Sequence, residues 1–203
     1  MPKSVIDRQG RSDATRTRIL DAAARLFKDK GFAATSLRDI AATANMKAGS
    51  LYYHFDSKED IVAEVLDLGI RHVLDAVAAA IADLPGGADG RQKIETAIVT
   101  HLEALLAHGD YTSANIRIFG QVPAKIQKRN MPVRNTYKKL WLGLFEQAQA
   151  DGTIRPDVDT KVLMLFLLGA LNSPVEWYRT DRLPIAKLAR LLTGYTLDGT
   201  APR

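Results

Sequence analysis

The chain has 203 residues, a net charge of +5 and no cysteine. This length suits one folding unit of ordinary size, or a small domain fused to a larger one. The absence of cysteine excludes disulfides and cysteine-based metal or nucleophile sites, which fits a reducing compartment. The N-terminal segment lacks the apolar core of a signal peptide, and the longest apolar run, Val162 to Leu171, is too short to span a bilayer. We therefore expect a cytoplasmic protein with no membrane partner.

The excess positive charge lies at the N-terminal end of the chain. Residues 1–58 contain 11 Lys/Arg and 6 Asp/Glu, whereas residues 59–203 contain 17 of each kind. A basic segment joined to a neutral one indicates that only the first part meets a polyanion such as nucleic acid. Chance is the alternative explanation, because the excess is modest.

The first helix is predicted from apolar periodicity. Residues 1–12 are polar, and we expect them to be a disordered basic arm. After Asp13, which suits a helix cap, apolar residues recur at three- and four-residue steps from Ile19 to Phe27. Gly31 ends this predicted helix.

Two short helices are expected next, at residues 36–44 and 47–53, with a tight turn between them. Ser36 and Asp39 have the spacing of a capping box at the start of the helix expected at 36–44. Because only Leu51 and Phe55 suit core positions in the second helix, its small, aromatic and basic residues face outward. Such a pair forms a helix-turn-helix unit, whose second helix enters the major groove of double-stranded DNA.

The rest of the chain also shows helical patterns. We expect Ser57 to cap a long helix and Asp159 or Thr160 to cap a later one. No alternating strand pattern and no internal repeat occur, so the predicted fold class is all-α. The helices expected after Ser57 are 57–83, 92–107, 113–119, 123–129, 132–150, 161–171 and 184–192.

Residues Thr15–Glu64 resemble the DNA-binding domain of the TetR family of transcription regulators. The matching stretches are RTRILDAAARLFKDKGFAATSLRDIAATA and MKAGSLYYHFDSKEDIVAEVL, which include the specific motif LYYHF-x-SKE. The resemblance implies a TetR-like all-α homodimer that binds a pseudo-palindromic operator. Its domains would be a basic arm at 1–12, a three-helix DNA-binding domain at 13–58, and a helical ligand-binding and dimerisation domain at 59–203.

The same resemblance assigns residues to DNA. Arg38 resembles a base-contacting residue on the first helix of the unit, and Lys58 resembles a backbone-contacting lysine at the start of the long helix. Thr35 or Ser36 would offer a hydroxyl and a helix N-terminus to phosphate. The other positions that would read bases or grip phosphates and thymine methyls are Lys47, Ala48, Gly49, Ser50, Tyr52, Tyr53 and His54.

Structural roles compete for several of these side chains. Tyr52 or Tyr53 could pack against the first helix, His54 could make a local hydrogen bond, and Arg38 could pair with a nearby aspartate. The N-terminal arginines, including Arg16, could reach a minor groove as a basic arm.

Apolar and charge patterns in the C-terminal half predict a small-molecule effector and a dimer interface. Val162–Leu171 is apolar on nearly every side, so either a partner subunit or other helices of the same subunit must cover it. Residues Tyr111–Phe145 hold seven basic residues and no acidic one, which indicates an anionic ligand, a DNA-facing surface or a solvated face. The ending SPVEWYR is similar to TetR-type regulators of lipid and acyl-thioester catabolism. An acyl-CoA effector is therefore one hypothesis, and an uncharged or simple carboxylate effector is the alternative.

The expected ligand-binding residues combine apolar walls with basic and polar groups. Most of the apolar ones, and the histidine among them, could equally belong to an ordinary core. The set is Leu68, His72, Leu102, Phe119, Arg129, Arg134, Trp141, Phe145, Leu168, Asn172 and Trp177.

Two other functional classes compete with a regulator. An enzyme is disfavoured because we find no metal-ligand cluster, phosphate-binding glycine loop or nucleophile motif, and we expect no cofactor. A nucleoid-type or non-ligand-responsive DNA-binding protein would need no large neutral C-terminal domain, and a nucleoid-type protein would show little sequence preference. We therefore expect a ligand-responsive, sequence-specific transcription regulator, a repressor released by a small hydrophobic or acyl-CoA effector.

Overall fold

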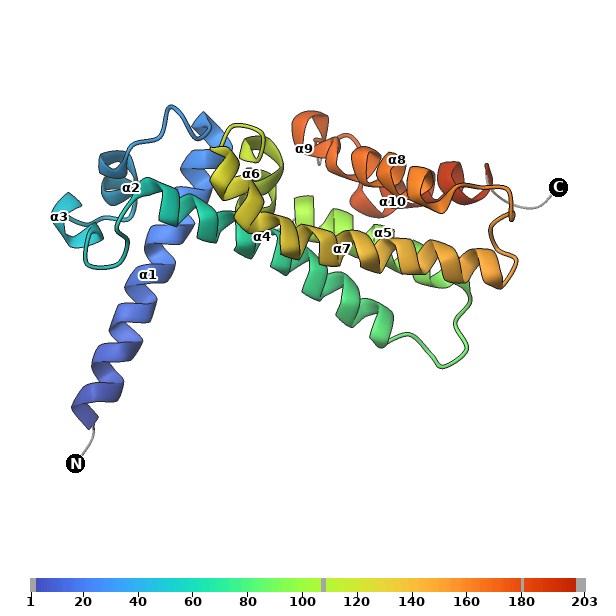
Figure 1. Cartoon of the computed structure of the whole chain (residues 1–203), viewed down its shortest axis with the longest axis horizontal. Coiled ribbons are helices and arrows are strands. Elements are labelled where there is room, and N and C mark those ends of the chain that lie inside the picture. The colour runs from blue at the N-terminus through green and yellow to red at the C-terminus, as the bar shows by residue number, and fades with distance from the viewer. Residues whose placement is uncertain (1–2, 107–108, 180, 200–203) are drawn as a thin grey trace. The chain divides into compact units, whose positions relative to one another are not determined.

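The computed structural model describes residues 3–106, 109–179 and 181–199, with the backbone alone for residues 3–11. All regular elements in these ranges are helices, which confirms the all-α fold class (Figure 1). None of the described helices is long and apolar enough to cross a membrane. The helices are α1 (Lys3–Lys30), α2 (Leu37–Thr43), α3 (Ala48–Leu51), α4 (Lys58–Ala82), α5 (Gly90–Leu106), α6 (Asp110–Ile118), α7 (Ala124–Ala150), α8 (Thr160–Asn172), α9 (Pro174–Trp177) and α10 (Ile185–Leu197).

The chain forms two compact units. Unit 1 comprises Met1–Gly69 and Asp110–Asn130, and unit 2 comprises Ile70–Gly109 and Met131–Arg203. Helices α4 and α7 therefore each begin in unit 1 and end in unit 2. The division differs from the expected boundary after residue 58, because α6 and the start of α7 pack with the N-terminal helices.

Unit 1 is built around the apolar stripe of α1. Ile19, Ala23 and Phe27 are fully buried, as the periodicity predicts. They pack in one cluster with apolar residues of α2, α3, the first half of α4, and α6. Burying a large apolar side chain stabilises a fold by roughly 1.5–3 kcal/mol, so this cluster fixes the short helices, which are too short to be stable alone.

Helix α1 begins earlier than expected. It starts at Lys3 rather than after Asp13, so residues 3–12 continue the helix and the prediction of a disordered arm is wrong for them. No proline interrupts this stretch. A polar segment extends a helix readily once buried residues further along have nucleated it. Residues 1–2 of the expected arm lie outside the described residues.

Three predicted helix starts are confirmed by their caps. At α2, the Asp39 N–H donates to Ser36 Oγ (3.2 Å) and the Ser36 N–H donates to Asp39 Oδ2 (2.9 Å), which completes the capping box. At α4, the Asp60 N–H donates to Ser57 Oγ (3.1 Å). The carboxylate of Asp159 accepts two N–H groups from the first turn of α8. Each cap satisfies donors that a helix start otherwise leaves unpaired.

Helix α7 joins two segments that the sequence analysis kept apart. Pro132, expected to begin a helix, lies inside α7. Proline removes one intrahelical donor, and this usually marks a helix boundary. Here Ile126 and Val133 are each buried in the core of their own unit, so packing on both sides of Pro132 keeps the helix continuous.

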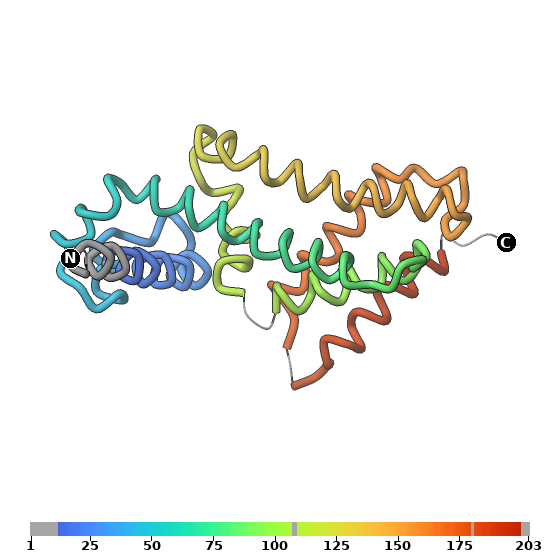
Figure 2. The backbone as a smooth tube through the Cα atoms, turned by 90° about the horizontal axis from the view of Figure 1, so that it is seen from below, coloured from blue at the N-terminus to red at the C-terminus, as the bar shows by residue number. Residues whose placement is uncertain are grey.

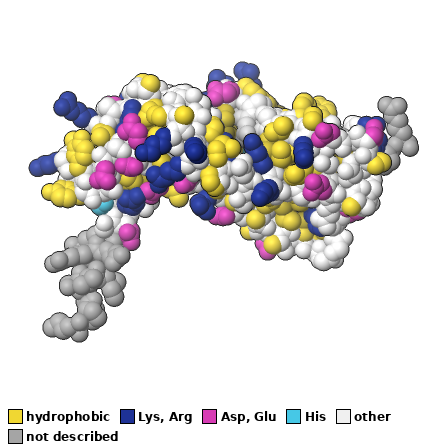
Figure 3. Space-filling view, viewed as in Figure 1, with side chains coloured by type: hydrophobic (Ala, Val, Ile, Leu, Met, Phe, Trp, Pro, Cys, Tyr) yellow, Lys and Arg dark blue, Asp and Glu magenta, His cyan; other side chains and the backbone are white. Residues whose placement is uncertain are grey.

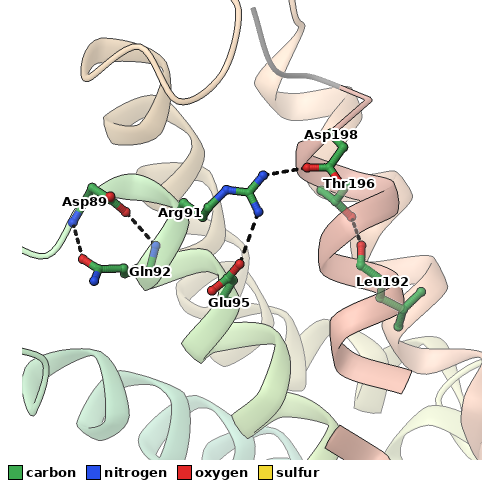
Figure 4. A network of polar contacts seen from close by, with 7 residues as sticks. All are labelled: Asp89, Arg91, Gln92, Glu95, Leu192, Thr196 and Asp198. Carbon is green, nitrogen blue, oxygen red and sulfur yellow. Dashed lines mark hydrogen bonds and ion pairs between the residues drawn. The ribbon is translucent and has the colours of Figure 1, made fainter. Parts of the chain in front are cut away.

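Unit 2 has its own apolar core, formed by parts of α4 and α7 and by α5, α8 and α10. Helix α10 packs beside α5 (Figures 1 and 2). At one end of this pair, Arg91 donates to Asp198 (2.6 Å) and to Glu95 (3.3 Å), as Figure 4 shows. Helix α5 begins at Gly90 rather than at residue 92, and α10 continues to Leu197 rather than ending at residue 192. The short helix α9 was not predicted.

Candidate nucleic-acid interface and ligand-binding core

The helix-turn-helix is fixed from one side by buried side chains. Asn45, in the predicted tight turn, has a φ of 52°, a left-handed conformation that asparagine adopts more readily than most residues. Leu51 of α3 and Phe55 just after it are buried, as predicted, in the cluster that contains Ile40. One face of α3 is therefore held against the core, and the other is left outward.

The outward side of residues 47–54, which comprise α3 and the turn after it, holds most of the residues predicted to contact DNA; the helix itself ends at Leu51 rather than at Tyr53 as expected. Tyr52 and Tyr53 are 58% and 89% exposed, so they do not pack against the first helix. A Cβ placed on Gly49 would meet no atom within 4 Å. Hydrophobic and basic side chains are at the surface where α2 and α3 lie (Figure 3). The remaining predicted residues of this face are exposed (Lys47, Ala48) or partly exposed (Ser50, His54), and Arg38 is exposed on α2.

Arg16 holds α1, α4 and the turn between α3 and α4 together. Its guanidinium pairs with the carboxylate of Glu64 and donates to the carbonyl oxygen of His54 (2.8 Å). It also lies 4.1 Å from the centre of the Phe55 ring, a favourable cation–π position. Arg16 therefore acts within the fold rather than as part of a minor-groove arm, while the side chains of Arg8 and Arg11 lie outside the described residues.

Thr35 has a structural role that the sequence analysis missed. Its side chain is 1% exposed, and its hydroxyl donates to the carbonyl oxygen of Gly31 (2.8 Å). The prediction that this hydroxyl reaches a phosphate is wrong, because burial shields it. Ser36 is exposed but its hydroxyl bonds to Asp39 (2.6 Å), and hydrogen bonds from Ser36 lower the pKa of Asp39 below its ordinary value. The exposed helix start at Ser36 thus remains the predicted phosphate contact.

Lys58 closes the loop between α1 and α2. Its Nζ donates to the carbonyl oxygens of Phe32 and Thr35 (2.9 Å each) and lies 4.2 Å from the centre of the Phe32 ring. These contacts satisfy most of the donor capacity of an ammonium group, which has three N–H bonds. The predicted DNA-backbone contact of Lys58 is therefore in competition with a role inside the protein.

Helix α6 is tied to α1 by polar contacts that join distant parts of the sequence. Lys28 pairs with Asp110 (2.6 Å), and the Tyr111 hydroxyl donates to Asp21 (2.7 Å). Burial raises the pKa of Tyr111, so this hydroxyl stays protonated. Gly69 lies so close to α6 that an added Cβ would collide with the carbonyl oxygen of Tyr111. These contacts place α6 in the same compact unit as the helix-turn-helix.

In unit 2, four side chains of α5 and α7 form a buried aromatic cluster. His101 Nδ1 lies 2.7 Å from the hydroxyl of Tyr137. The rings of Tyr137 and Trp141 meet edge to face with their centres 6.3 Å apart, and Phe145 lies 6.1 Å from Trp141. All four side chains are at most 4% exposed. Burial lowers the pKa of His101 to about 4, although the side chain of Asn172 opposes this shift.

The residues predicted to bind a ligand divide between the two units. Leu102, Trp141, Phe145 and Leu168 belong to the unit 2 core, and Asn172 approaches His101 there. Partial burial in unit 2 lowers the pKa of Arg134 to about 10. The others are exposed or belong to unit 1: His72 and Trp177 are exposed in unit 2, Leu68 and Arg129 are exposed in unit 1, and Phe119 packs on the unit 1 core.

Helices α8 and α10 carry an exposed apolar surface. Phe166 is 70% exposed and Tyr195 is 74% exposed. Helix α8 is therefore buried on one side only, through Met164, Leu167 and Leu171. The sequence analysis expected Val162–Leu171 to be covered either by a partner subunit or by helices of the same subunit. The same subunit does not cover the side that carries Val162, Leu165 and Phe166. We define the apolar surface of α8 and α10 as Val162, Leu165, Phe166, Leu191 and Tyr195.

Among the described residues, no group of histidine and acidic side chains is arranged to hold a metal ion.

Comparison with known proteins supports the same assignment along nearly the whole chain. Residues 19–65 match the bacterial regulatory proteins of the tetR family, and residues 87–200 match the tetracyclin repressor-like C-terminal domain. The HTH-type transcriptional repressor KstR2 of Rhodococcus jostii (strain RHA1) is 33% identical over 203 residues, covering 98% of this chain and 97% of that protein.

Solved structures show the same fold. The ketosteroid transcriptional regulator KstR2 of Mycobacterium tuberculosis superposes with a TM-score of 0.80 at 24% identity, covering 93% of this chain and 95% of that one. AibR in complex with isovaleryl coenzyme A and operator DNA gives a TM-score of 0.82 at 23% identity, covering 90% and 98%. With its helix-turn-helix, its helical C-terminal unit and these full-length relatives, the chain belongs to the tetR family of bacterial regulatory proteins.

Proposed function

We propose that this protein acts in the cytoplasm as a repressor, which binds a pseudo-palindromic operator as a homodimer and releases it on binding a coenzyme A thioester. The observation that carries the DNA-binding part is the outward face of α3. Leu51 and Phe55 anchor this short helix, whereas Tyr52, Tyr53 and Gly49 stay accessible. An exposed helix with a glycine and aromatic tips suits base edges and phosphates in a major groove.

The homodimer is supported by the apolar surface of α8 and α10. Five large apolar side chains at 38–74% exposure are unusual on a single chain unless a partner covers them. A two-fold axis through such a surface would pair it with itself, as most homodimers do. Two-fold symmetry would also present two copies of α3 to two related half-sites.

The effector class is supported by the contents of unit 2 and of α7. The apolar core around Trp141 and Phe145 suits an apolar acyl group. Within unit 2, helix α7 carries Arg134, Lys138 and Lys139 and no acidic residue before Glu146. Basic side chains of this kind bind the phosphates of coenzyme A, arginine through two parallel hydrogen bonds. The relative AibR was crystallised with such a thioester.

Coupling between effector and DNA would run through α4. This helix begins in unit 1, where Ile61 and Val65 pack with the helix-turn-helix, and ends in unit 2. An effector that binds one arrangement of α4 more tightly would shift the protein toward that arrangement. The shift can be no larger than the difference in affinity between the two states.

The test is a titration of protein–operator complexes with three compounds: an apolar acid, its coenzyme A thioester, and coenzyme A alone. We expect release by the thioester at the lowest concentration. Arg134→Ala should weaken thioester binding, because it would remove a bidentate phosphate contact beside the unit 2 core. Arg182→Ala, a matched change of an exposed arginine outside the acid-free stretch, should not. Equal release by the free acid would contradict the thioester proposal.

A further inference from the structure

Arg16 on α1 binds the backbone at the end of the segment that is predicted to contact DNA. Its Nη1 donates to the carbonyl oxygen of His54 (2.8 Å), in the turn between α3 and α4. Its Nε donates to Oε1 of Glu64 on α4 (3.1 Å), and its Nη2 pairs with Oε2 of the same carboxylate. One guanidinium group therefore joins α1, α4 and the end of residues 47–54.

This segment depends on such contacts because α3 has only four residues. A helix of that length is not stable alone, and the carbonyl oxygens at its C-terminal end lack donors from within the helix. The backbone after it turns tightly, with the N–H groups of His54 and Phe55 donating to the carbonyl oxygen of Leu51 (2.9 and 3.1 Å). Buried Leu51 and Phe55 anchor the inner side of the segment. The bond from Arg16 adds a fixed point on its backbone.

The geometry of this contact suits arginine better than lysine. A guanidinium presents five N–H groups in one rigid plane, so it can hold a carboxylate with two of them and a carbonyl oxygen with a third. The guanidinium also lies 4.1 Å from the centre of the Phe55 ring. A lysine could still pair with Glu64, but its ammonium group has no rigid plane to hold both acceptors at once.

A contribution to folding is a weak explanation for this arrangement. The side chains of Arg16 and Glu64 are 39% and 29% exposed, and partly exposed ion pairs contribute little to stability. The residues directly before His54 are the exposed Tyr52 and Tyr53. Contacts with base edges and phosphates require accurate placement, because a hydrogen bond weakens steeply as its geometry departs from the ideal.

We propose that Arg16 is a positioning residue for operator recognition. It fixes the His54 carbonyl group, and with it the side chains of Tyr52 and Tyr53, without touching DNA itself. Glu64 holds the guanidinium in place from α4, so the helix that would carry the effector signal is linked directly to the DNA-contacting segment. The inference rests on the proposed DNA contacts of residues 47–54.

The test measures the affinity of full-length Arg16→Lys for operator DNA and for a random duplex by fluorescence anisotropy. We expect operator affinity to fall about tenfold, the size of one impaired base contact. Affinity for random DNA and the salt slope should not change, because the charge is kept. Glu64→Gln should also weaken operator binding, and adding it to Arg16→Lys should cost little more, since the two residues act together. Arg25→Lys, a matched change of an exposed arginine on α1, should bind as wild type.

A second readout separates positioning from general stabilisation. Operators with single base-pair changes are compared for the wild type, Arg16→Lys and Tyr53→Ala, well below the melting temperature of each protein. The base pairs at which Arg16→Lys loses its preference should be those at which Tyr53→Ala loses it. A residue that only stabilises the fold would lower the melting temperature and alter no base preference.

Unchanged operator affinity in Arg16→Lys, with weakened binding by Tyr53→Ala, would overturn the inference and leave the proposed DNA contacts in place. A salt slope that falls by about one in Arg16→Ala and is restored by Arg16→Lys would also overturn it, because Arg16 would then be a phosphate contact. Lost operator preference in Arg16→Lys, with normal binding by Tyr53→Ala, would sustain the positioning role and contradict the tyrosine contact.

Discussion

A substitution at Gly49 can test the DNA-binding role of α3 without disturbing its role in folding. Because a Cβ at this position meets no protein atom within 4 Å, Gly49→Ala should leave the melting temperature unchanged or slightly raised. The added methyl group would instead meet DNA where the backbone approaches the base edges. We expect operator binding to weaken by about tenfold, the size of one lost base contact. Fluorescence anisotropy on operator DNA measures it.

Gly143, in the middle of α7, provides the matched control. It is exposed, and a Cβ there also meets nothing within 4 Å. Gly143→Ala should have the same small effect on stability and none on DNA affinity. If Gly49→Ala bound DNA as well as wild type, the placement of α3 against base edges would be wrong.

His101 should make folding stability depend on pH. Its pKa is about 4 in the folded chain against 6.5 when exposed, so between these values the unfolded chain binds a proton that the folded chain does not. Stability is therefore fully present above about pH 6.5 and falls as the pH drops toward 4. Between pH 7 and pH 5 this histidine should account for about 2 kcal/mol of the fall in unfolding free energy. Urea titrations at both pH values measure it.

The comparison that isolates His101 uses two variants. His101→Leu should lose this part of the pH dependence, whatever its absolute stability. His72→Leu should keep it, because His72 is exposed in the folded chain. An unchanged pH dependence in His101→Leu would contradict the burial of a neutral histidine at this position.

At the residue scale, the sequence predicted which side chains are exposed better than it predicted which residues contact one another inside the protein. The exposed residues of α3 and the anchors Leu51 and Phe55 follow from local periodicity. The roles of Arg16 and Thr35 do not, because their partners lie in other elements or the backbone. Arg16 meets Glu64, 48 residues away, and no local pattern marks such a pair. The hydroxyl of Thr35 turns inward, although the same residue type also suits an exposed helix start.

Among the elements, the loop between α1 and α2 depends on Lys58. Lys58→Ala removes two hydrogen bonds to the carbonyl oxygens of Phe32 and Thr35. We expect the unfolding free energy to fall by about 1–3 kcal/mol, with little change in how DNA affinity depends on salt. Lys47→Ala is the control, since Lys47 is exposed and its side chain makes no capping bond. It should leave stability intact and lower the salt slope by about one. If Lys58→Ala instead kept its stability and lowered the salt slope, Lys58 would be a DNA contact after all.

Helices α8 and α10 should determine the oligomeric state. Leu165 is 56% exposed in the single chain, so Leu165→Arg should fold normally but place an unpaired charge in a dimer interface. We expect monomers by light scattering at micromolar concentration. Tyr52→Arg, which changes a similarly exposed side chain (58%) on unit 1, should remain dimeric. A Leu165→Arg protein that stays dimeric would exclude this surface as the interface.

The elements were predicted where caps and apolar periodicity coincide, as at Ser36, Ser57 and Asp159. The start of α1 and the continuity of α7 were not predicted. In both cases a local signal, polar composition or Pro132, was overridden by packing elsewhere along the same helix. Local propensity is a weak guide where buried residues elsewhere in the same helix already stabilise it.

At the scale of the whole molecule, two functional parts could be predicted from the sequence, but not which helices belong to each part. The helix-turn-helix and a helical C-terminal part both follow from composition, periodicity and the family resemblance. The inclusion of α6 in unit 1 follows only from contacts such as Lys28 with Asp110 and Tyr111 with Asp21, which join residues 82 and 90 positions apart. Contacts of that range leave no repeating signal in one sequence.

This protein should recognise a two-fold symmetric DNA sequence as a dimer. Selection of bound duplexes from a random pool, at fixed salt, tests it most directly. We predict enrichment of an inverted repeat whose half-site centres lie about one helical turn or more apart, since two symmetric copies of α3 must each reach a major groove. The selected sequence should bind at least about a thousandfold more tightly than random DNA at that salt. A pool with no inverted repeat, bound no better than random DNA, would contradict recognition of a symmetric operator by a dimer.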